Sequence, residues 1–228
     1  MPLPLYLAMT AAEISKNMAL PVHLAYMACH FSPYSTGLSN LPDSLPPGSM
    51  LILNDRIPVH GHDPERIAGQ LVSFVEEKQV SALLLDFERP PSPLCQAIVD
   101  TICSALQCPV GVKPDYGADP DRAVFLSIAP HEAPLKAIHK WQGRRIWLEA
   151  AVERSYVQIG SDGAQLLPPP DREMCLPFYD EALFAHYRTD VTKHHAGFTI
   201  HRTPQDVFQL LENCHADLAV GLWQQLKE

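Results

Sequence analysis

Two acidic residues at the end of an apolar run give the strongest indication of chemistry in this sequence. The run is Ala-Leu-Leu-Leu over residues 82–85, and it continues as Asp86, a phenylalanine and Glu88. Residues two apart on a β-strand point to the same face, so Asp86 and Glu88 are expected to lie together. Two neighbouring carboxylates oppose each other's ionisation, which favours one protonated and one ionised carboxyl near neutral pH. Such a pair can protonate the oxygen of a glycosidic bond.

Ion pairing is the alternative interpretation of these two carboxylates. The cations of Arg56, Arg89 and Arg145 could pair with Asp86 and Glu88 at the rim of the fold. Exposed ion pairs of this kind are common and have no chemical role. The sequence leaves both interpretations open.

Eight short apolar runs provide the elements that would position these side chains. They cover residues 3–9, 23–31, 50–54, 82–87, 109–113, 123–128, 145–149 and 197–201. The runs show little alternation of polar and apolar residues, which is typical of parallel strands buried on both faces. Helical patterns lie between several of them. We therefore expect an α/β fold, a (β/α)8 TIM-like barrel formed as a single domain by residues 1–228, with a doubly wound open sheet as the alternative.

Some units of this barrel are expected to be irregular. Residues 40–48 and 115–121 have the composition of loops, so the helices there should be short or missing. The turn signal Asp162-Gly163 between two apolar stretches predicts a β-hairpin insertion around residues 152–170. We expect it to belong to a longer insertion, residues 152–196, over one end of the barrel. Residues 216–226 are expected to continue the last helix.

Polar residues follow most of the predicted strands, where barrels of this kind bind their ligands. Tyrosine rings near strand ends are further candidates, because flat rings stack on the apolar faces of sugars. The residues that we expect to bind substrate are Asn54, Asp55, Glu149, His201, Arg202, Tyr34, Tyr116 and Tyr179.

Asp86 and Glu88, at the end of the predicted fourth strand, resemble a known catalytic motif. They match the tail of the Asp-x-x-Asp-x-Asp-x-Glu signature of family 18 glycoside hydrolases, the chitinase-like TIM barrels. The resemblance implies that Glu88 is the general acid and that Asp86 assists the N-acetyl group of the substrate. Tyr179 and the aspartate after it resemble the Tyr-Asp pair of the same family.

The sequence departs from this family at several positions. Ser81 and Leu84 stand where the signature has its two earlier aspartates. The candidate for the family's last-strand tryptophan is Trp223, which lies beyond His201 in the predicted helix. A barrel that binds a carbohydrate or a partner without catalysis is therefore an alternative.

Lys113 supports a third class of function. It follows the fifth apolar run, and a lysine in an apolar barrel could form a Schiff base, as in a lyase or aldolase. The alternative is an ion pair of Lys113 with Asp86 or Asp115 at the rim.

Composition narrows the possible partners. The chain has 228 residues and a net charge of −9 without a basic run, which argues against nucleic-acid binding. No apolar stretch is long enough to span a membrane, and the amino terminus is not typical of a signal peptide. The six cysteines form no Cys-x-x-Cys motif, so we expect reduced thiols and a cytoplasmic protein.

Cofactor motifs are equally sparse. Neither glycine-rich phosphate loop pattern occurs. His60 and His62 are close in sequence, but Asp63 after them is better explained as a helix cap than as a metal ligand. We therefore expect no cofactor and no metal, and the expected partner is a small molecule or an oligosaccharide.

Overall fold

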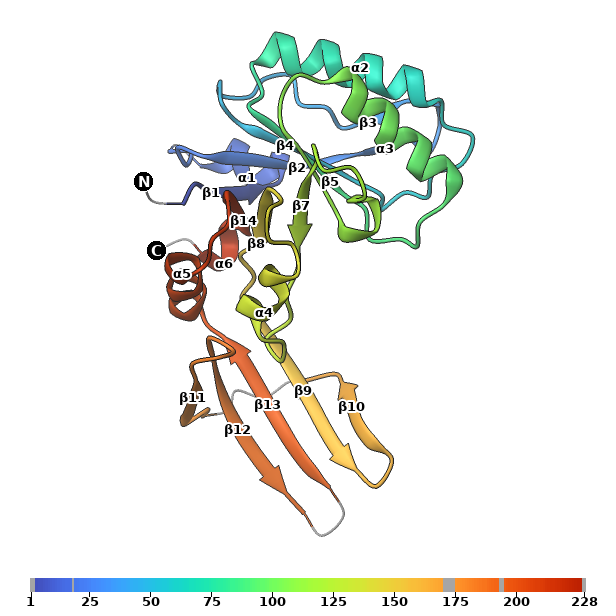
Figure 1. The fold of residues 1–228 in the computed structure, drawn as a ribbon. Coiled ribbons are helices and arrows are strands. Elements are labelled where there is room, and N and C mark those ends of the chain that lie inside the picture. Colours follow the sequence, from blue (N-terminus) through green and yellow to red (C-terminus); the bar gives the residue numbers. More distant parts are fainter. Residues whose placement is uncertain (1–2, 18, 170–174, 193–194, 227–228) are drawn as a thin grey trace.

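Eight parallel strands form a closed barrel (Figure 1). The structure is a computed structural model that describes residues 3–17, 19–169, 175–192 and 195–226. In order around the barrel the strands are β1 (Leu5–Met9), β2 (Leu24–Phe31), β4 (Met50–Asn54), β5 (Ala82–Asp86), β6 (Val110–Val112), β7 (Ala123–Leu126), β8 (Ile146–Glu149) and β14 (Leu218–Leu222). The ring closes because β1 pairs with both β2 and β14. The predicted TIM-like α/β barrel is confirmed.

Side chains fill the barrel interior. Ile52, Leu84, Phe125 and Trp147 belong to one inner cluster, and all are at most 5% exposed. Other side chains of the barrel strands join the clusters that contain buried helix residues. The barrel is thus a packed core, and in barrels of this kind a ligand binds near the strand ends.

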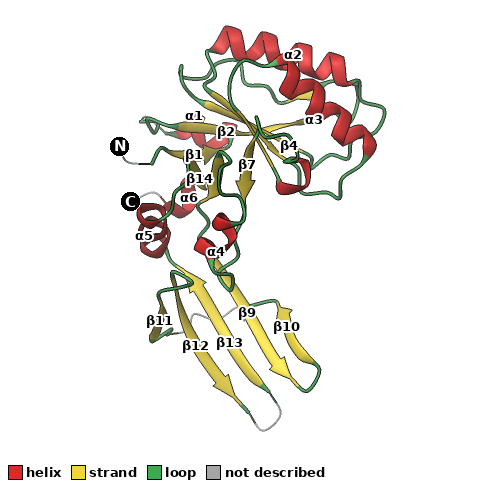
Figure 2. Cartoon of the chain, in the orientation of Figure 1, coloured by secondary structure: helices red, strands yellow, loops and turns green. Residues whose placement is uncertain are grey.

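Helices connect several of the strands, as Figure 2 shows. They are α1 (Ala11–Lys16), α2 (Pro64–Lys78), α3 (Pro93–Ala105), α4 (Pro134–His139), α5 (Pro204–Asn213) and α6 (Trp223–Leu226). Between β2 and β4 lies only the short strand β3 (Leu38–Ser39), and between β6 and β7 only the 3-10 helix η1 (Pro114–Tyr116). The prediction of short or missing helices in these two units is confirmed. No helix of the described residues is both long and apolar enough to cross a membrane.

Local sequence signals explain where the longer helices begin. The side chains of Asp63, Ser92 and Thr203 each accept a hydrogen bond from a backbone N–H in the first turn, and a proline follows each of them. The caps satisfy N–H groups that have no partner inside the helix, and proline fits the first helical position. These helices therefore begin where the sequence predicts.

A five-stranded antiparallel sheet, which we call the arm (residues 153–202), leaves the barrel after β8. Its strand order is β10 (Gly163–Leu167), β9 (Glu153–Gly160), β13 (Ala196–Arg202), β12 (Ala185–Val191) and β11 (Phe178–Asp180). The predicted hairpin is its β9–β10 pair. Figure 1 shows that most of the arm extends away from the barrel, so the expectation that it covers one end of the barrel is wrong.

The last barrel strand is not the one that the sequence predicted. The apolar run 197–201 lies in β13, where it pairs antiparallel with β9 and β12. The eighth barrel strand is β14, in the segment that was predicted to be helical. Within β14, Gly221 is closely packed, because a side chain there would meet the backbone oxygen of Ala150 and the side chain of Leu226.

Candidate functional site

A cavity of about 900 Å³ opens at the carboxyl ends of the barrel strands. Its size is in the usual range of small-molecule sites. Apolar side chains of the barrel line its inner part, among them Ala8, Ile52, Leu84, Phe125 and Val220. Polar side chains of the strand ends and loops line the rest, among them Asn54, Asp55, Asp86, Glu88 and Glu149. An apolar base with a few convergent polar groups is typical of a ligand site.

Asp86 is the last residue of β5, and Glu88 follows it two residues later; both line the cavity. Asp86 Oδ1 lies 3.0 Å from Lys113 Nζ. The predicted ion pair of Lys113 with Asp86 is therefore confirmed. The side chain of Glu88 is exposed, and the described residues form no ion pair with it.

Asp55 fixes the backbone that carries Glu88. It is 3% exposed, and its two carboxylate oxygens accept hydrogen bonds of 2.9 Å from the backbone N–H groups of Glu88 and Arg89. The Arg89 guanidinium in turn donates to the backbone oxygen of Asp55. Asp55, which the sequence predicted to bind substrate, lines the cavity. Its carboxylate is engaged with the backbone, so its contribution here is to position the Glu88 loop.

Asn54 lies beside Asp86, because the two residues are register partners in β4 and β5. Its amide group donates to the backbone oxygens of Met27 (3.2 Å) and Cys29 (2.9 Å). The register of β2 shifts between Tyr26 and Cys29, so these bonds satisfy carbonyls at an irregular point of the barrel. Asn54 thus supports the wall of the cavity next to Asp86.

Glu149 ends β8 and lines the same cavity. Burial raises the pKa of the Glu149 carboxyl above its ordinary value. A hydrogen bond from Ser127 and the charge of Lys113 lower this pKa, whereas the charges of Asp86 and Glu153 raise it. The net shift is upward, so Glu149 keeps its proton to a higher pH than an exposed glutamate does.

Five residues that the sequence predicted to bind substrate lie outside the described lining of the cavity. Tyr34 is 96% exposed on the loop after β2, and Tyr116 is buried in the core at 2% exposure. Tyr179, His201 and Arg202 are in the arm. His201 and Arg202 were expected at the end of a barrel strand. They end β13 instead, and β13 belongs to the arm.

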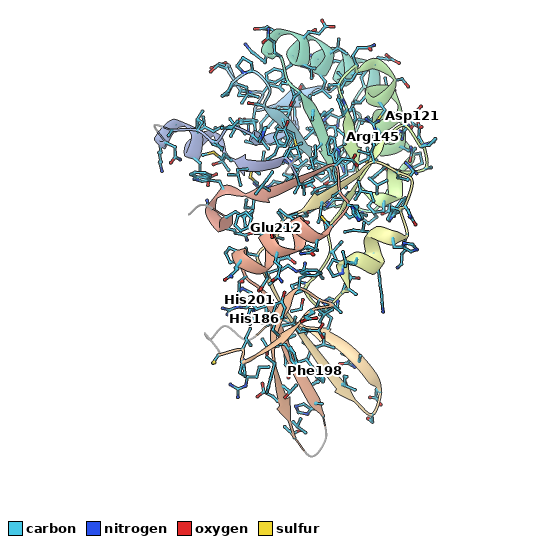
Figure 3. All side chains as sticks on the ribbon, turned by 60° about the vertical axis from the view of Figure 1, so that its left-hand side comes forward. Asp121, Arg145, His186, Phe198, His201 and Glu212 are labelled. Carbon is cyan, nitrogen blue, oxygen red and sulfur yellow. The ribbon has the colours of Figure 1, made fainter. Side chains whose placement is uncertain are left out.

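Arg202 instead joins the arm to the barrel. It is 3% exposed and donates hydrogen bonds to the backbone oxygens of Ile128, Leu183 and Phe184. His201 lies next to it, opposite His186 on the neighbouring strand, and Figure 3 shows these two histidines together. His186 Nδ1 is 3.1 Å from the buried carboxylate of Asp206, at the start of α5.

The cavity has polar lining residues that the sequence analysis did not assign, notably Glu153 and Gln225. Both follow barrel strands, β8 and β14, by a few residues. Recognition of the run 218–222 as a strand would have pointed to Gln225. Trp223 directly follows β14, so it does stand at the end of the last barrel strand, although it is not among the described residues that line the cavity.

The fold and the cavity define a class: a TIM-like α/β barrel with a partly polar cavity at the carboxyl ends of its strands. No family model and no curated protein match the sequence. Among solved structures, the chain is similar to the spore cortex-lytic enzyme SleL of Bacillus megaterium QM B1551. The match has a TM-score of 0.50 at 8% sequence identity and covers 100% of this chain and 71% of the SleL chain. At this identity the likeness establishes the fold alone.

Proposed function

We propose that this protein is a glycoside hydrolase, with Glu88 as the general acid and Asp86 as the assisting carboxylate. The observation that carries the proposal is that both residues line one cavity at the mouth of the barrel in different surroundings. Asp86 is paired with Lys113, whereas Glu88 has no ion pair among the described residues. Two carboxyls in unlike environments are suited to two different roles.

The geometry is consistent with these roles. Glu88 is exposed to the cavity, and the bonds of Asp55 to the backbone of Glu88 and Arg89 hold its position. It can therefore reach the oxygen of a glycosidic bond and donate a proton to it. Asp86, fixed beside Lys113, assists the N-acetyl group of the substrate, whose carbonyl oxygen attacks the sugar carbon as the protonated glycosidic oxygen leaves. Water then hydrolyses the cyclic intermediate and returns the proton to Glu88.

The resemblance to family 18 enzymes favours an N-acetyl sugar as substrate. SleL, which shares the fold, is a spore cortex-lytic enzyme, so a cell-wall glycan is the first substrate to test. Asn54 and Glu149, which line the cavity, are the expected binding residues. Five other predicted binding residues do not contribute to the described lining of the cavity, so the proposed binding mode does not use them. They are Tyr34, Tyr116, Tyr179, His201 and Arg202.

A non-catalytic, sugar-binding barrel is the second candidate. The observation that favours it is that Leu84 points into the cavity where the family signature has an aspartate. The lyase alternative is less favoured, because Lys113 Nζ is engaged by Asp86 at 3.0 Å and by the Ser127 hydroxyl at 2.9 Å. An ammonium group held in this way is not a free amine nucleophile.

Replacement of the general acid tests the proposal. Glu88→Gln keeps the size of the side chain and removes the proton, so the rate should fall by about 10²–10⁴-fold. Stability should be unchanged, because the side chain is exposed. The measurement is release of reducing ends from peptidoglycan and from N-acetylglucosamine oligosaccharides, together with urea unfolding.

Glu76→Gln, an exposed position on α2, is the matched control and should retain the wild-type rate. Absence of cleavage by the wild-type protein across these glycans would contradict a hydrolase. Sugar binding without cleavage would favour the second candidate. A Glu88→Gln variant with the full rate would exclude Glu88 as the acid.

A further inference from the structure

The strands of the arm sort their side chains into an apolar face and a polar face. Neighbouring residues of a strand point to opposite faces, and the pairing of the strands fixes which side chains share a face. The polar face carries charged groups such as Arg154, Arg188 and Asp190. The side chains that define what we call the apolar face are Val157, Ile159, Leu166, Phe178, Val191 and Phe198. The other side chains in the same three cross-strand rows are uncharged.

Much of the apolar face is exposed to solvent. Val191, Leu166 and Phe178 are 77%, 61% and 50% exposed. Figure 1 shows that the outer part of the arm projects beyond the barrel, with no described helix lying along it. Phe198 marks the middle of the arm in Figure 3. Proteins rarely leave a contiguous apolar surface of this kind without a partner, so the apolar face is a candidate interaction surface.

The row of this face nearest to the barrel is partly covered. Ser155 is 6% exposed, and its Oγ lies 3.0 Å from Nδ1 of His131, in the loop after β7. Ile200, in the same cross-strand row, is also 6% exposed. Arg202 binds the same loop through the backbone oxygen of Ile128. The loop thus covers the barrel end of the face, whereas the rows farther out remain exposed in the described structure.

We propose that the outer part of the apolar face binds the same face of a second copy of this chain, so that the protein forms a two-fold dimer through its arms. A sheet with one apolar face needs another layer to bury it, and two such sheets pack face to face in β-sandwiches. A two-fold axis places the same patch of each copy against the other. This inference does not depend on the proposed function.

Charge favours a second copy as the occupant. The net charge of −9 makes two copies repel each other wherever their charged surfaces approach. The outer rows of the apolar face carry no charged side chain, so contact at this face buries no charge in either copy. A lipid surface is less favoured, because the described residues of this face include no lysine or arginine to attract anionic headgroups.

The size of the arm suits this packing. The three central strands, β9, β13 and β12, are seven or eight residues long, and β10 and β11 extend the sheet on either side. A sheet of five such strands is as large as one layer of a typical β-sandwich domain. Two arms in contact therefore have the dimensions of a complete sandwich.

The mass of the full chain in solution tests the proposal. Sedimentation velocity over a wide range of protein concentration should show a mass that rises from the 25.3 kDa of one chain toward twice this value. The mass of one chain at every concentration would overturn the proposal. A mass that continues to rise beyond two chains would overturn the two-fold contact, because a two-fold contact is closed.

Leu166→Glu should weaken the dimer at least about 10-fold, because a carboxylate of each copy would lose its hydration in the contact. The urea midpoint of the monomer should stay at the wild-type value, since this side chain is exposed. Val191→Glu, on another strand of the same face, should have the same effect and decides the matter if the first variant folds poorly.

Gln165→Glu is the matched control, because Gln165 is exposed on the same strand as Leu166 and points to the polar face. It adds the same charge and should dimerise as the wild type does. Equal weakening in this control would overturn the assignment to the apolar face, as would wild-type association of both Leu166→Glu and Val191→Glu. A monomer that co-sediments with phosphatidylcholine vesicles would assign the face to lipid instead and overturn the dimer.

Discussion

Asp55 shows that a buried carboxylate beside a cavity can hold the backbone of a neighbouring loop. Both of its oxygens accept N–H groups, those of Glu88 and Arg89. These two N–H groups follow β5, where the chain leaves the barrel and no strand partner is available. Without Asp55 they would lose their partners close to the proposed catalytic acid, so stability and activity should change together.

Asp55→Ala should lower the free energy of unfolding by about 1–3 kcal/mol, the usual effect of leaving buried groups without hydrogen bonds. It should also reduce activity, because the Glu88 loop loses its support. Urea unfolding and the rate of glycan cleavage are the two measurements. Asp43→Ala, at an exposed position, is the control and should change neither. A stable Asp55→Ala variant would show that water replaces the carboxylate.

At the scale of elements, the packing of the barrel includes a close approach between the Trp147 side chain and the backbone at Gly111. A β-carbon on Gly111, in β6, would collide with Cε3 and Cζ3 of the Trp147 ring, from β8. Trp147 is 2% exposed and belongs to the cluster that fills the barrel. A glycine is therefore required at this position for a packing reason, although its backbone conformation is ordinary.

Gly111→Ala should destabilise the protein by about 1–3 kcal/mol, because the tryptophan must move in a packed interior. Gly69→Ala is the matched control. Gly69 lies inside α2, and nothing lies within 4 Å of the added carbon, so alanine should stabilise the helix by about 0.5–1 kcal/mol. Urea unfolding of both variants should show a lower free energy of unfolding for Gly111→Ala and a higher one for Gly69→Ala. Equal effects would contradict the packing explanation.

At the scale of the whole molecule, the arm is fastened to the barrel by buried polar groups. Arg202 donates to backbone oxygens on both sides of the junction, at Ile128 and at Leu183. The adjacent His201 has a lowered pKa, first because of burial and then because of the positive charge of Arg154. His186 also lowers this pKa, and Asp206 raises it.

Acid should therefore weaken the arm. At pH values just below the ordinary histidine value of 6.5, His201 binds a proton more readily in the unfolded chain than in the folded one, because its pKa is lowered in the folded protein. The unfolded state then binds more protons, so stability falls as the pH falls through this range. Hydrogen exchange of the β12 and β13 amides should accelerate at mildly acidic pH, and His201→Gln should reduce this acceleration. His139→Gln, exposed on α4, is the control. The same acceleration in His201→Gln would contradict the role of His201.

Much of the fold follows from signals that are local in the sequence. Strands buried on both faces are uniformly apolar, helix caps are single residues next to prolines, and a tight hairpin needs residues such as Asp162 and Gly163. Each signal depends on a few neighbouring residues, so the sequence alone was enough to predict the barrel and the hairpin. The cavity position of Asp86, Glu88 and Asn54 follows in the same way, because each stands at the end of such a strand.

Only the tertiary structure decided which of two apolar runs completes the barrel. Residues 197–201 and 218–222 are both short and apolar, and what separates them is their partners, β9 and β12 for the first and β1 and β8 for the second. That choice removed His201 and Arg202 from the site and brought Gln225 into it. The pairing of Lys113 with Asp86 and the burial of Glu149 likewise depend on residues far apart in the chain. The pKa of a carboxyl depends on its burial and on the charges and hydrogen bonds around it. Closure of the barrel determines which residues those neighbours are.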